Sequence, residues 1–324
     1  MAKNVAVIIC NMGGPDNLEA VKPYLTNIFQ DPAILSYPVG QFLRNRLAAM
    51  LVNSRLEDSK DIYRLIGGKT PLLEITHQQA VALATRLNSK NKGSFTVIPA
   101  MRYWHPFIED VWEKVAADAF DKIVFVSLYP FYSYTTSGSL LAKVADMKKM
   151  YKDTADKTVE VDRFGNHPQF IEAIAGQIND ALKSHPGHKD LLLSAHSIPM
   201  RSIKKGDPYR DEIEQSVNRL KQQLPADINL YLAFQSKVGP VDWLGPATDD
   251  TIQELAQKGV KKLLVYPLGF VADNSETIYE IGMLYGDLAK EKGIADYIRI
   301  DSLNTDPIFV DTLTSLVLDA INGK

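Results

Sequence analysis

The chain has 324 residues, of which 45% are hydrophobic and 23% charged, and its formal net charge is −3. This length suits two domains, and the composition is that of an ordinary globular protein. The lack of a basic excess argues against nucleic acid as a partner. A single cysteine, Cys10, excludes an internal disulfide and an all-cysteine metal site. The start lacks the features of a cleaved signal and no stretch reaches the length of a spanning helix, so we expect a cytoplasmic protein.

Short apolar runs rich in Val, Ile and Leu alternate with amphipathic stretches along the chain. The runs predict strands at 5–10, 95–101, 122–128, 191–194, 229–234, 262–268 and 297–300. The amphipathic stretches predict helices at 72–88, 106–118, 167–183, 209–223 and 247–258. Continuous apolar runs are typical of parallel strands that are covered on both faces. The alternation therefore predicts an α/β protein built from doubly wound parallel sheets.

A weak internal repeat indicates two similar halves. "DKIVFVSLYPFYSYTTSGS" begins at 121 and "VKKLLVYPLGFVADNSET" begins at 260, and each runs from a strand through an aromatic loop to a polar helix start. We place the boundary at the charged stretch near 140–160, which gives domains 1–145 and 146–305.

Aromatic side chains gather in the loops that follow the predicted strands, where open α/β sheets bind their ligands. With one methionine they form the set Met12, Tyr103, Trp104, Tyr129, Phe131, Tyr132, Tyr134, Trp243 and Phe270. The clustering favours a flat apolar ligand, and the alternative is a buried interface between the domains.

His196 ends one predicted strand, in "DLLLSAHSIPM", and Pro199 prevents the strand from continuing. A neutral imidazole at a strand's carboxyl end can accept a proton near pH 7 or bind a divalent metal. The alternative is a core histidine with satisfied hydrogen bonds.

Glu276 and Glu280 are four residues apart, so on a helix they share one face. Asp273 and Ser275 are the candidate caps of that helix. Carboxylates at this position can accept protons or pass on a hard cation, and the alternative is a solvated acidic face. Arg102 precedes two aromatics and suits a ligand carboxylate, with a surface salt bridge as the alternative.

Six loop motifs follow one another over nearly the whole chain: "NMGGPD", "IGGKTPL", "AMRYWHPFI", "YPFYSYTTSGS", "SAHSIPM" and "FQSKVGPVDWLGP". Together, and in this order, they resemble ferrochelatase, the metal-inserting enzyme of haem synthesis. The resemblance implies two Rossmann-like domains with a porphyrin cleft between them. It also implies insertion of Fe²⁺ into protoporphyrin IX to give protohaem, with release of two protons.

The resemblance assigns roles to individual residues. It implies that His196 and Glu276 are catalytic and meet the metal, and that Glu280 is the next acid along a helix with a widened π-type turn. The residues expected to contact the porphyrin are Met12, Arg102, Tyr103, Tyr132, Trp243 and Phe270. Iron is then a substrate, and no permanently bound cofactor is expected. Since no cysteine-rich C-terminal extension is present, we expect no iron–sulfur cluster.

Two positions depart from the family pattern. The family usually reads "SDHIETLYEID" where this chain reads "ADNSETIYEIG", so a second histidine is Asn274 and an acidic residue is Gly282. An asparagine cannot take up a proton, which puts a proton relay through this position in doubt. These departures are the support for a porphyrin carrier as an alternative function. Cobalt or nickel insertion into a sirohydrochlorin-like ring, or iron insertion into coproporphyrin, is the alternative within the chelatases. The absence of a GxGxxG loop argues against a nucleotide-binding enzyme.

Two further expectations come from the family. The last helix, within 306–324, is expected to pack back on the first domain. The stretch 39–56 combines arginines with apolar residues and lies where the family has the lip of its cleft, so peripheral contact with the inner face of the membrane is a hypothesis.

Overall fold

A computed structural model describes residues 4–34, 40–90, 93–237, 239 and 241–323. The chain divides into two compact units, Met1–Arg163 with Val310–Lys324, and Phe164–Phe309. This division falls later than the 145/146 boundary expected from the sequence. The reason is that residue 145 lies inside helix α5 (Ser137–Met150), and the following strand β4 (Thr158–Val161) pairs with β3 (Lys122–Ser127). The C-terminal residues from Val310 group with the first unit, where Asp311 lies 3.2 Å from Arg86.

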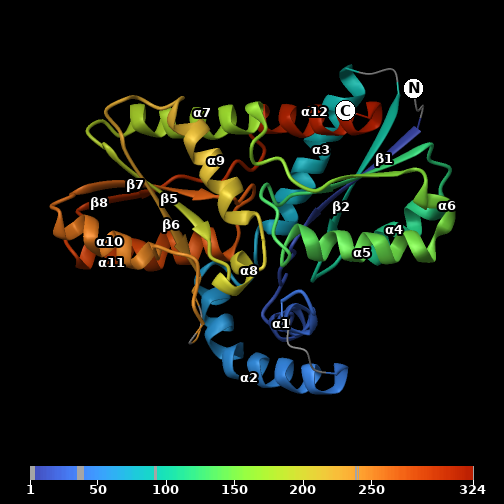
Figure 1. Cartoon of the computed structure of the whole chain (residues 1–324), viewed down its shortest axis with the longest axis horizontal. Helices are drawn as coiled ribbons and strands as arrows, with labels where there is room; N and C mark the ends of the chain where they lie inside the picture. Colours follow the sequence, from blue (N-terminus) through green and yellow to red (C-terminus); the bar gives the residue numbers. More distant parts are fainter. Residues whose placement is uncertain (1–3, 35–39, 91–92, 238, 240, 324) are drawn as a thin grey trace. The chain divides into compact units, whose positions relative to one another are not determined.

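The first unit is built on a parallel sheet of strand order β2-β1-β3-β4. Its central strand β1 (Asn4–Asn11) is fully buried from Val5 to Cys10, as expected for a strand covered on both faces. In Figure 1, α4 and α5 cover one face of this sheet and α3 covers the other. The remaining bounds are β2 (Ser94–Met101), α1 (Val21–Gln30), α2 (Gln41–Leu65), α3 (Leu72–Lys90), α4 (Ile108–Ala117) and α6 (Lys152–Ala155).

The second unit repeats this topology with the order β6-β5-β7-β8, also parallel. Its central strand is β5 (Asp190–His196), and α10 with α11 lies on one face while α7 with α9 lies on the other (Figure 1). Its helices are α7 (Pro168–Ser184), α8 (Met200–Lys204), α9 (Tyr209–Lys221), α10 (Thr248–Gln257) and α11 (Tyr285–Glu291). The last helix, α12 (Pro307–Asn322), begins in this unit and continues in the first. The other strands are β6 (Asn229–Gln235), β7 (Lys262–Leu268) and β8 (Asp296–Arg299), and η1 (Glu276–Leu284) is a π-helix.

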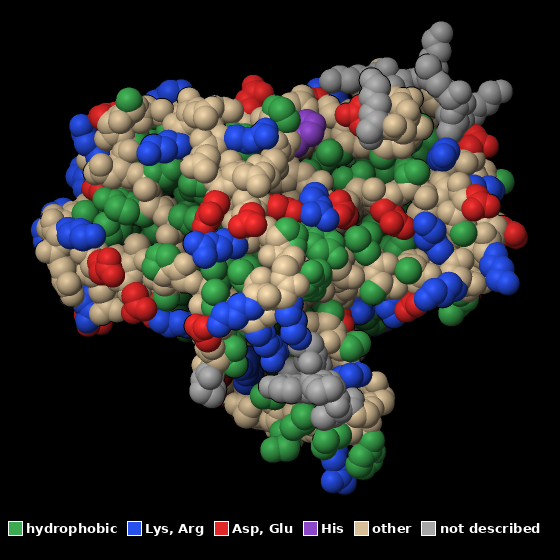
Figure 2. Space-filling view, viewed as in Figure 1, with side chains coloured by type: hydrophobic (Ala, Val, Ile, Leu, Met, Phe, Trp, Pro, Cys, Tyr) green, Lys and Arg blue, Asp and Glu red, His purple; other side chains and the backbone are tan. Residues whose placement is uncertain are grey.

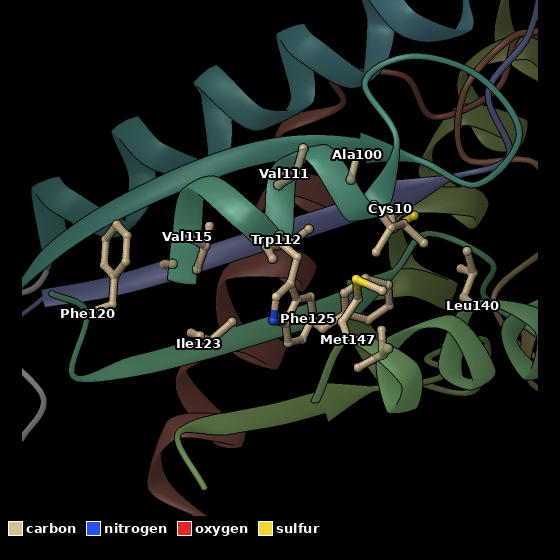
Figure 3. Close-up of a cluster of buried hydrophobic side chains, with 14 residues drawn as sticks. Cys10, Ala100, Val111, Trp112, Val115, Phe120, Ile123, Phe125, Leu140 and Met147 are labelled. Atoms are coloured by element: carbon tan, nitrogen blue, oxygen red, sulfur yellow. The ribbon is translucent and has the colours of Figure 1, made fainter. Parts of the chain in front are cut away.

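A dense apolar core holds the first sheet against its helices. Trp112 of α4 is fully buried, and its ring lies among Ile123 and Phe125 of β3 and Met147 of α5 (Figure 3). The indole Nε1–H donates to the Thr154 hydroxyl at 3.1 Å, so the polar atom of this large side chain is satisfied. This packing keeps the carboxyl ends of the strands in fixed positions.

The predicted fold class is confirmed: the chain is an α/β protein with two Rossmann-like parallel sheets of the same strand order. All seven predicted strands are present, and the repeat segments at 121 and 260 contain β3 and β7, the third strands of the two units. The short edge strand β4 was missed because only one residue of "TVEV" is buried. Among the described residues, no helix has the length and apolar character needed to cross a bilayer. The cleft expected between the halves stays a prediction.

Candidate active site

A histidine–glutamate pair marks the carboxyl end of the second sheet. His196 is the last residue of β5, and Glu276 is the first residue of η1. The imidazole Nδ1 lies 2.8 Å from the Glu276 carboxylate, and the side chains are 40% and 27% exposed respectively. The Tyr209 hydroxyl donates to the His196 carbonyl at 2.9 Å and fixes the end of the strand. The pair is therefore held by the protein and still reachable from solvent.

Ser236 joins this pair to the second glutamate of η1. Its backbone N–H donates to Glu280 at 2.9 Å, and its hydroxyl lies 2.5 Å from the other oxygen of that carboxylate. The same hydroxyl is 3.4 Å from Glu276, so both glutamates face Ser236. Tyr285 donates a further hydrogen bond to Glu280 at 2.8 Å. Ser236 adopts a left-handed backbone conformation, with φ at 64°, a strained geometry that recurs at functional sites.

A buried chain of hydrogen bonds supports Glu276 from below. The Ser194 hydroxyl donates to Oε1 of Gln235 at 2.9 Å and is 2.9 Å from the Thr248 hydroxyl. Because Ser194 has one proton to give, Thr248 is the donor to Ser194. The amide of Gln235 then points its Nε2–H toward Glu276, at 3.4 Å. The parallel register of β5 and β6 places His196 opposite Gln235 and so brings this chain to the pair.

The charges of these groups are coupled. Burial tends to lower the pKa of the His196 imidazole, but the carboxylates of Glu276 and Glu280 outweigh it and raise that pKa. For Glu276, burial tends to raise the pKa, while His196 and hydrogen bonds from Gln235 and Ser236 lower it. Burial and the charge of Glu276 raise the pKa of Glu280. The site thus favours a charged His196–Glu276 pair beside a carboxyl that holds its proton more readily.

The start of η1 differs from the sequence expectation. Asp273 and Ser275 were the candidate caps, but the side chain that accepts hydrogen bonds from the first helical N–H groups belongs to Asn274. Asp273 instead forms an ion pair with Arg299 at 2.7 Å. The widened helix expected from the resemblance is confirmed, since η1 is a π-helix over its whole length.

The remaining predicted residues of the second unit, Trp243 and Phe270, are partly buried. Trp243 forms a bridge with Pro199 directly after the strand that carries His196. Phe270 follows β7, and its N–H donates to the Pro267 carbonyl at 3.3 Å. Both residues therefore lie in loops at the same edge of the sheet as the histidine, as the sequence predicted.

In the first unit, Arg102 and Tyr103 are committed to a buried carboxylate. Both donate to the same oxygen of Asp31, each at 2.8 Å, and the Ser139 hydroxyl lies 2.5 Å from it. Arg102 also donates to Ser139 at 2.9 Å, and Tyr103 is only 2% exposed. In this structure the two residues form an internal network with Asp31 and Ser139, and Arg102 lies at its rim. Their expected contact with a ligand stays a prediction. Burial, first of all, and then the Asp31 charge raise the pKa of the Tyr103 hydroxyl.

Met12 and Tyr132, also of the first unit, are partly buried. The Met12 carbonyl accepts the Tyr103 N–H at 2.9 Å, which ties the loop after β1 to the loop after β2. The Arg163 guanidinium lies over the Tyr132 ring, 4.3 Å from its centre. Met12 directly follows β1 and Tyr132 lies between β3 and α5, so both residues lie in loops at the carboxyl edge of the first sheet.

Sequence reasoning missed the supporting polar residues: Asp31, Ser139, Ser194, Gln235, Ser236 and Thr248. Gln235 and Ser236 stand in the quoted motif "FQSKVGPVDWLGP". They could have been found because this motif begins at the end of β6, the strand that pairs with the His196 strand. Asp31 had no such signal, because it follows a helix and meets Arg102 only through the fold. Within the described residues, no three or more His, Cys, Asp or Glu side chains form a cluster suited to a metal ion.

Comparisons with known proteins identify the family of the chain. A family model described as ferrochelatase matches residues 4–321. A ferrochelatase of Aquifex aeolicus is 39% identical over 315 residues, with 97% of this chain and 99% of that protein covered. A ferrochelatase of Geotalea uraniireducens is 38% identical over 328 residues and the match covers 100% of both chains.

Solved structures show the same fold at low identity. SirB from Bacillus subtilis with Fe³⁺ has a TM-score of 0.58 at 11% identity, over 99% of this chain and 97% of SirB. CbiX, a terminal enzyme of sirohaem biosynthesis, has a TM-score of 0.54 at 13% identity, over 98% and 99%. At these identities the likeness concerns the fold alone.

Proposed function

Since the chain belongs to the ferrochelatase family and is therefore a metal chelatase of haem biosynthesis, we propose that His196 and Glu276 carry the chemistry. The reaction is the insertion of Fe²⁺ into protoporphyrin IX to form protohaem. Two pyrrole N–H protons leave the ring as the dication enters, so the site must supply a base that does not hold iron permanently. The hydrogen bond of 2.8 Å between His196 and Glu276 is the observation that supports this assignment.

The contact with Glu276 supports Nε2 as the nitrogen of His196 that acts as the base. The raised pKa of His196 favours its charged form, and the neutral form that can act as a base becomes more abundant as the pH rises. An ionised Glu276 only accepts hydrogen bonds, so in that neutral form Nδ1 carries the proton and Nε2 keeps its lone pair. Nε2 accepts a pyrrole proton, and Glu276 stabilises the imidazolium that forms. General-base help of this kind contributes on the order of 100- to 10,000-fold. Once the proton is on His196, Glu276 and Glu280 offer the next acceptors through Ser236.

The same groups suit a transient iron ligand. An imidazole nitrogen and carboxylate oxygens bind ferrous iron, and His196 with Glu276 gives a sparse donor set. A sparse set is appropriate for an ion that must be handed on to the ring.

The aromatic and thioether side chains supply the second element of catalysis. A flat porphyrin hides its nitrogen lone pairs in the ring plane, and a bent ring presents them to the metal. Only binding that is stronger to the bent form than to the flat form accelerates the reaction. Met12, Tyr132, Trp243 and Phe270 are the side chains that we assign to this role, with Arg102 toward a porphyrin carboxylate.

The activity is tested by anaerobic metallation with a set of rings and metals. Protein is mixed with Fe²⁺ or Co²⁺ and with protoporphyrin IX, coproporphyrin or sirohydrochlorin, and loss of porphyrin fluorescence is followed. We expect the highest kcat/KM for Fe²⁺ with protoporphyrin IX. Stoichiometric binding of the rings without any metallation would instead identify a carrier. Faster turnover of coproporphyrin or sirohydrochlorin would show that the more highly carboxylated ring, and not protoporphyrin IX, is the substrate.

We also propose peripheral membrane contact through α2. Val39, the first residue of the predicted stretch, lies outside the described residues, but residues 41–56 form the first part of this helix. Phe42 is 73% and Met50 69% exposed, and the Arg46 guanidinium lies 4.9 Å from the centre of the Phe42 ring. Figure 2 shows apolar and basic side chains gathered on the surface over α2. This combination suits the headgroup region of an anionic bilayer.

Flotation with vesicles tests the membrane contact. We expect the protein to float with phosphatidylglycerol-containing vesicles and less with purely zwitterionic ones. The double variant Phe42→Ser/Met50→Ser should lose flotation. Leu65→Ser is the matched control, because Leu65 is 57% exposed at the far end of the same helix. Equal flotation of all three proteins would contradict the assignment.

A further inference from the structure

The first N–H groups of η1 are satisfied by one amide side chain. Oδ1 of Asn274 accepts the N–H of Glu276 at 2.8 Å and that of Thr277 at 3.4 Å. Its Nδ2 donates to the Ala272 carbonyl at 3.2 Å. Both polar ends of the Asn274 side chain are therefore engaged with the backbone on either side of it.

Thr277 also forms a hydrogen bond with the backbone of Asn274. Its hydroxyl oxygen accepts the Asn274 N–H at 3.0 Å, while its proton goes to the Asp273 carboxylate at 2.8 Å. A cap residue and the residue three positions later that hydrogen-bond each other's backbone N–H groups form a capping box. η1 thus begins with a reciprocal cap whose second position, Glu276, meets His196.

The cap is anchored to the sheet by Asp273. This residue is 7% exposed, and its carboxylate accepts hydrogen bonds from Arg299 at 2.7 Å and from Asn304 at 2.9 Å. Arg299 ends β8, and the side chain of Asn304 also accepts the Asp273 N–H at 2.9 Å. The backbone before Glu276 is therefore fixed from two sides, and Asn274 is the link from this anchor to the helix.

We infer that Asn274 is a positioning residue for the reaction: its side chain holds the backbone of Glu276 so that the carboxylate meets Nδ1 of His196. The expected effect on the reaction rate rests on the proposed function. The expected effect on the position of Glu276 rests only on the hydrogen bonds of Asn274. Asn274 does not relay protons, because an amide cannot take one up and both of its polar atoms are engaged.

Three variants test the inference. Asn274→Ala removes the cap, whereas Asn274→Ser restores a neutral acceptor, since Ser and Asn are comparable caps. Asp306→Ala is the matched control. Its carboxylate accepts the N–H groups of Ile308 and Phe309 at 2.8 and 3.0 Å, so it caps a different helix, α12.

A displacement of about 1 Å at a reacting group costs on the order of 100-fold in rate. We expect Asn274→Ala to lower kcat between about 10- and 100-fold, with KM for protoporphyrin IX unchanged and with kcat largely restored in Asn274→Ser. Asp306→Ala should lower the melting temperature without changing kcat. Wild-type kcat in Asn274→Ala, or a loss that also occurs in Asp306→Ala, would overturn the positioning role.

Crystal structures of the metal-free variants separate this inference from the proposed function. The hydrogen bond between Glu276 and His196 should be broken in Asn274→Ala and present in Asn274→Ser. If the wild-type protein shows no metallation, the proposed function has failed. The variant structures alone then test whether Asn274 positions Glu276. An intact hydrogen bond in Asn274→Ala would then overturn the inference.

Discussion

The substitution Ser194→Ala, at a buried position, should raise the pKa of the Glu276 carboxyl and so change the pH dependence of the reaction. Ser194 and Thr248 are fully buried and Gln235 is 1% exposed, so water does not replace a lost partner there. The change removes the donor to Oε1 of Gln235 and the acceptor for the Thr248 hydroxyl. The amide oxygen of Gln235 is then left without this donor.

The size of the effect follows from this burial. A buried acceptor without a partner costs about 1–3 kcal/mol of folding stability. That loss is well above the roughly 0.5 kcal/mol of an ordinary surface change and is measurable by urea unfolding. Thr248→Val should also destabilise the protein, because Ser194 then loses its incoming hydrogen bond.

The effect on activity distinguishes the two variants. Without Ser194, the Gln235 amide loses the hydrogen bond to its oxygen that orients its Nε2–H toward Glu276. A carboxylate that loses a donor in a buried setting has a raised pKa, so Glu276 binds a proton at higher pH. The acid limb of kcat/KM against pH should therefore move to higher pH in Ser194→Ala. In Thr248→Val, where Ser194 still donates to Gln235, it should not move.

Initial rates of metal insertion over a pH series measure this shift, with stability measured in parallel. A Ser194→Ala profile that coincides with the wild-type profile, despite a lower unfolding free energy, would refute the reasoning. It would mean that the amide of Gln235 does not influence the protonation of Glu276.

Two further predictions follow from the charged groups of the second unit. Glu276→Gln removes the main cause of the raised His196 pKa and leaves burial, which lowers it. The His196 limb of the pH–rate profile should move to lower pH, and kcat should fall on the order of 100-fold; an unmoved limb would contradict the coupling. For Asp273, burial tends to raise the pKa, but Arg299 and hydrogen bonds from Asn304 and Thr277 lower it below 3.8. Its stabilising effect is therefore full above that value and is lost as the pH falls through the lower folded-state pKa. Urea unfolding of Asp273→Asn should show a deficit of about 1–3 kcal/mol at neutral pH that disappears in acid, and a deficit independent of pH would exclude the charge as its cause.

The sequence was sufficient for the described strands other than β4, and for the residue that ends β5. The apolar run before His196 and the proline after it predicted a strand end, and β5 ends at that residue. The spacing of Glu276 and Glu280 predicted a shared face, and both carboxylates contact Ser236. These predictions succeeded because each depends on a local pattern.

The supporting groups could not be predicted in this way. Asp31 meets Arg102 across 71 positions, and Ser194 meets Thr248 across 54, so each contact depends on strand register and loop geometry. The cap of η1 was assigned to the neighbours of Asn274, because several adjacent polar residues satisfy the same sequence rule. Only the backbone geometry selects among them.

The central claim is that His196 accepts a pyrrole proton as iron enters the ring. It is tested most directly by anaerobic mixing of protein, Fe²⁺ and protoporphyrin IX, with porphyrin fluorescence and haem absorption followed for the wild type and for His196→Ala. We predict repeated turnover by the wild type, and porphyrin binding without metallation by the variant. Turnover by His196→Ala at the wild-type rate would contradict the claim.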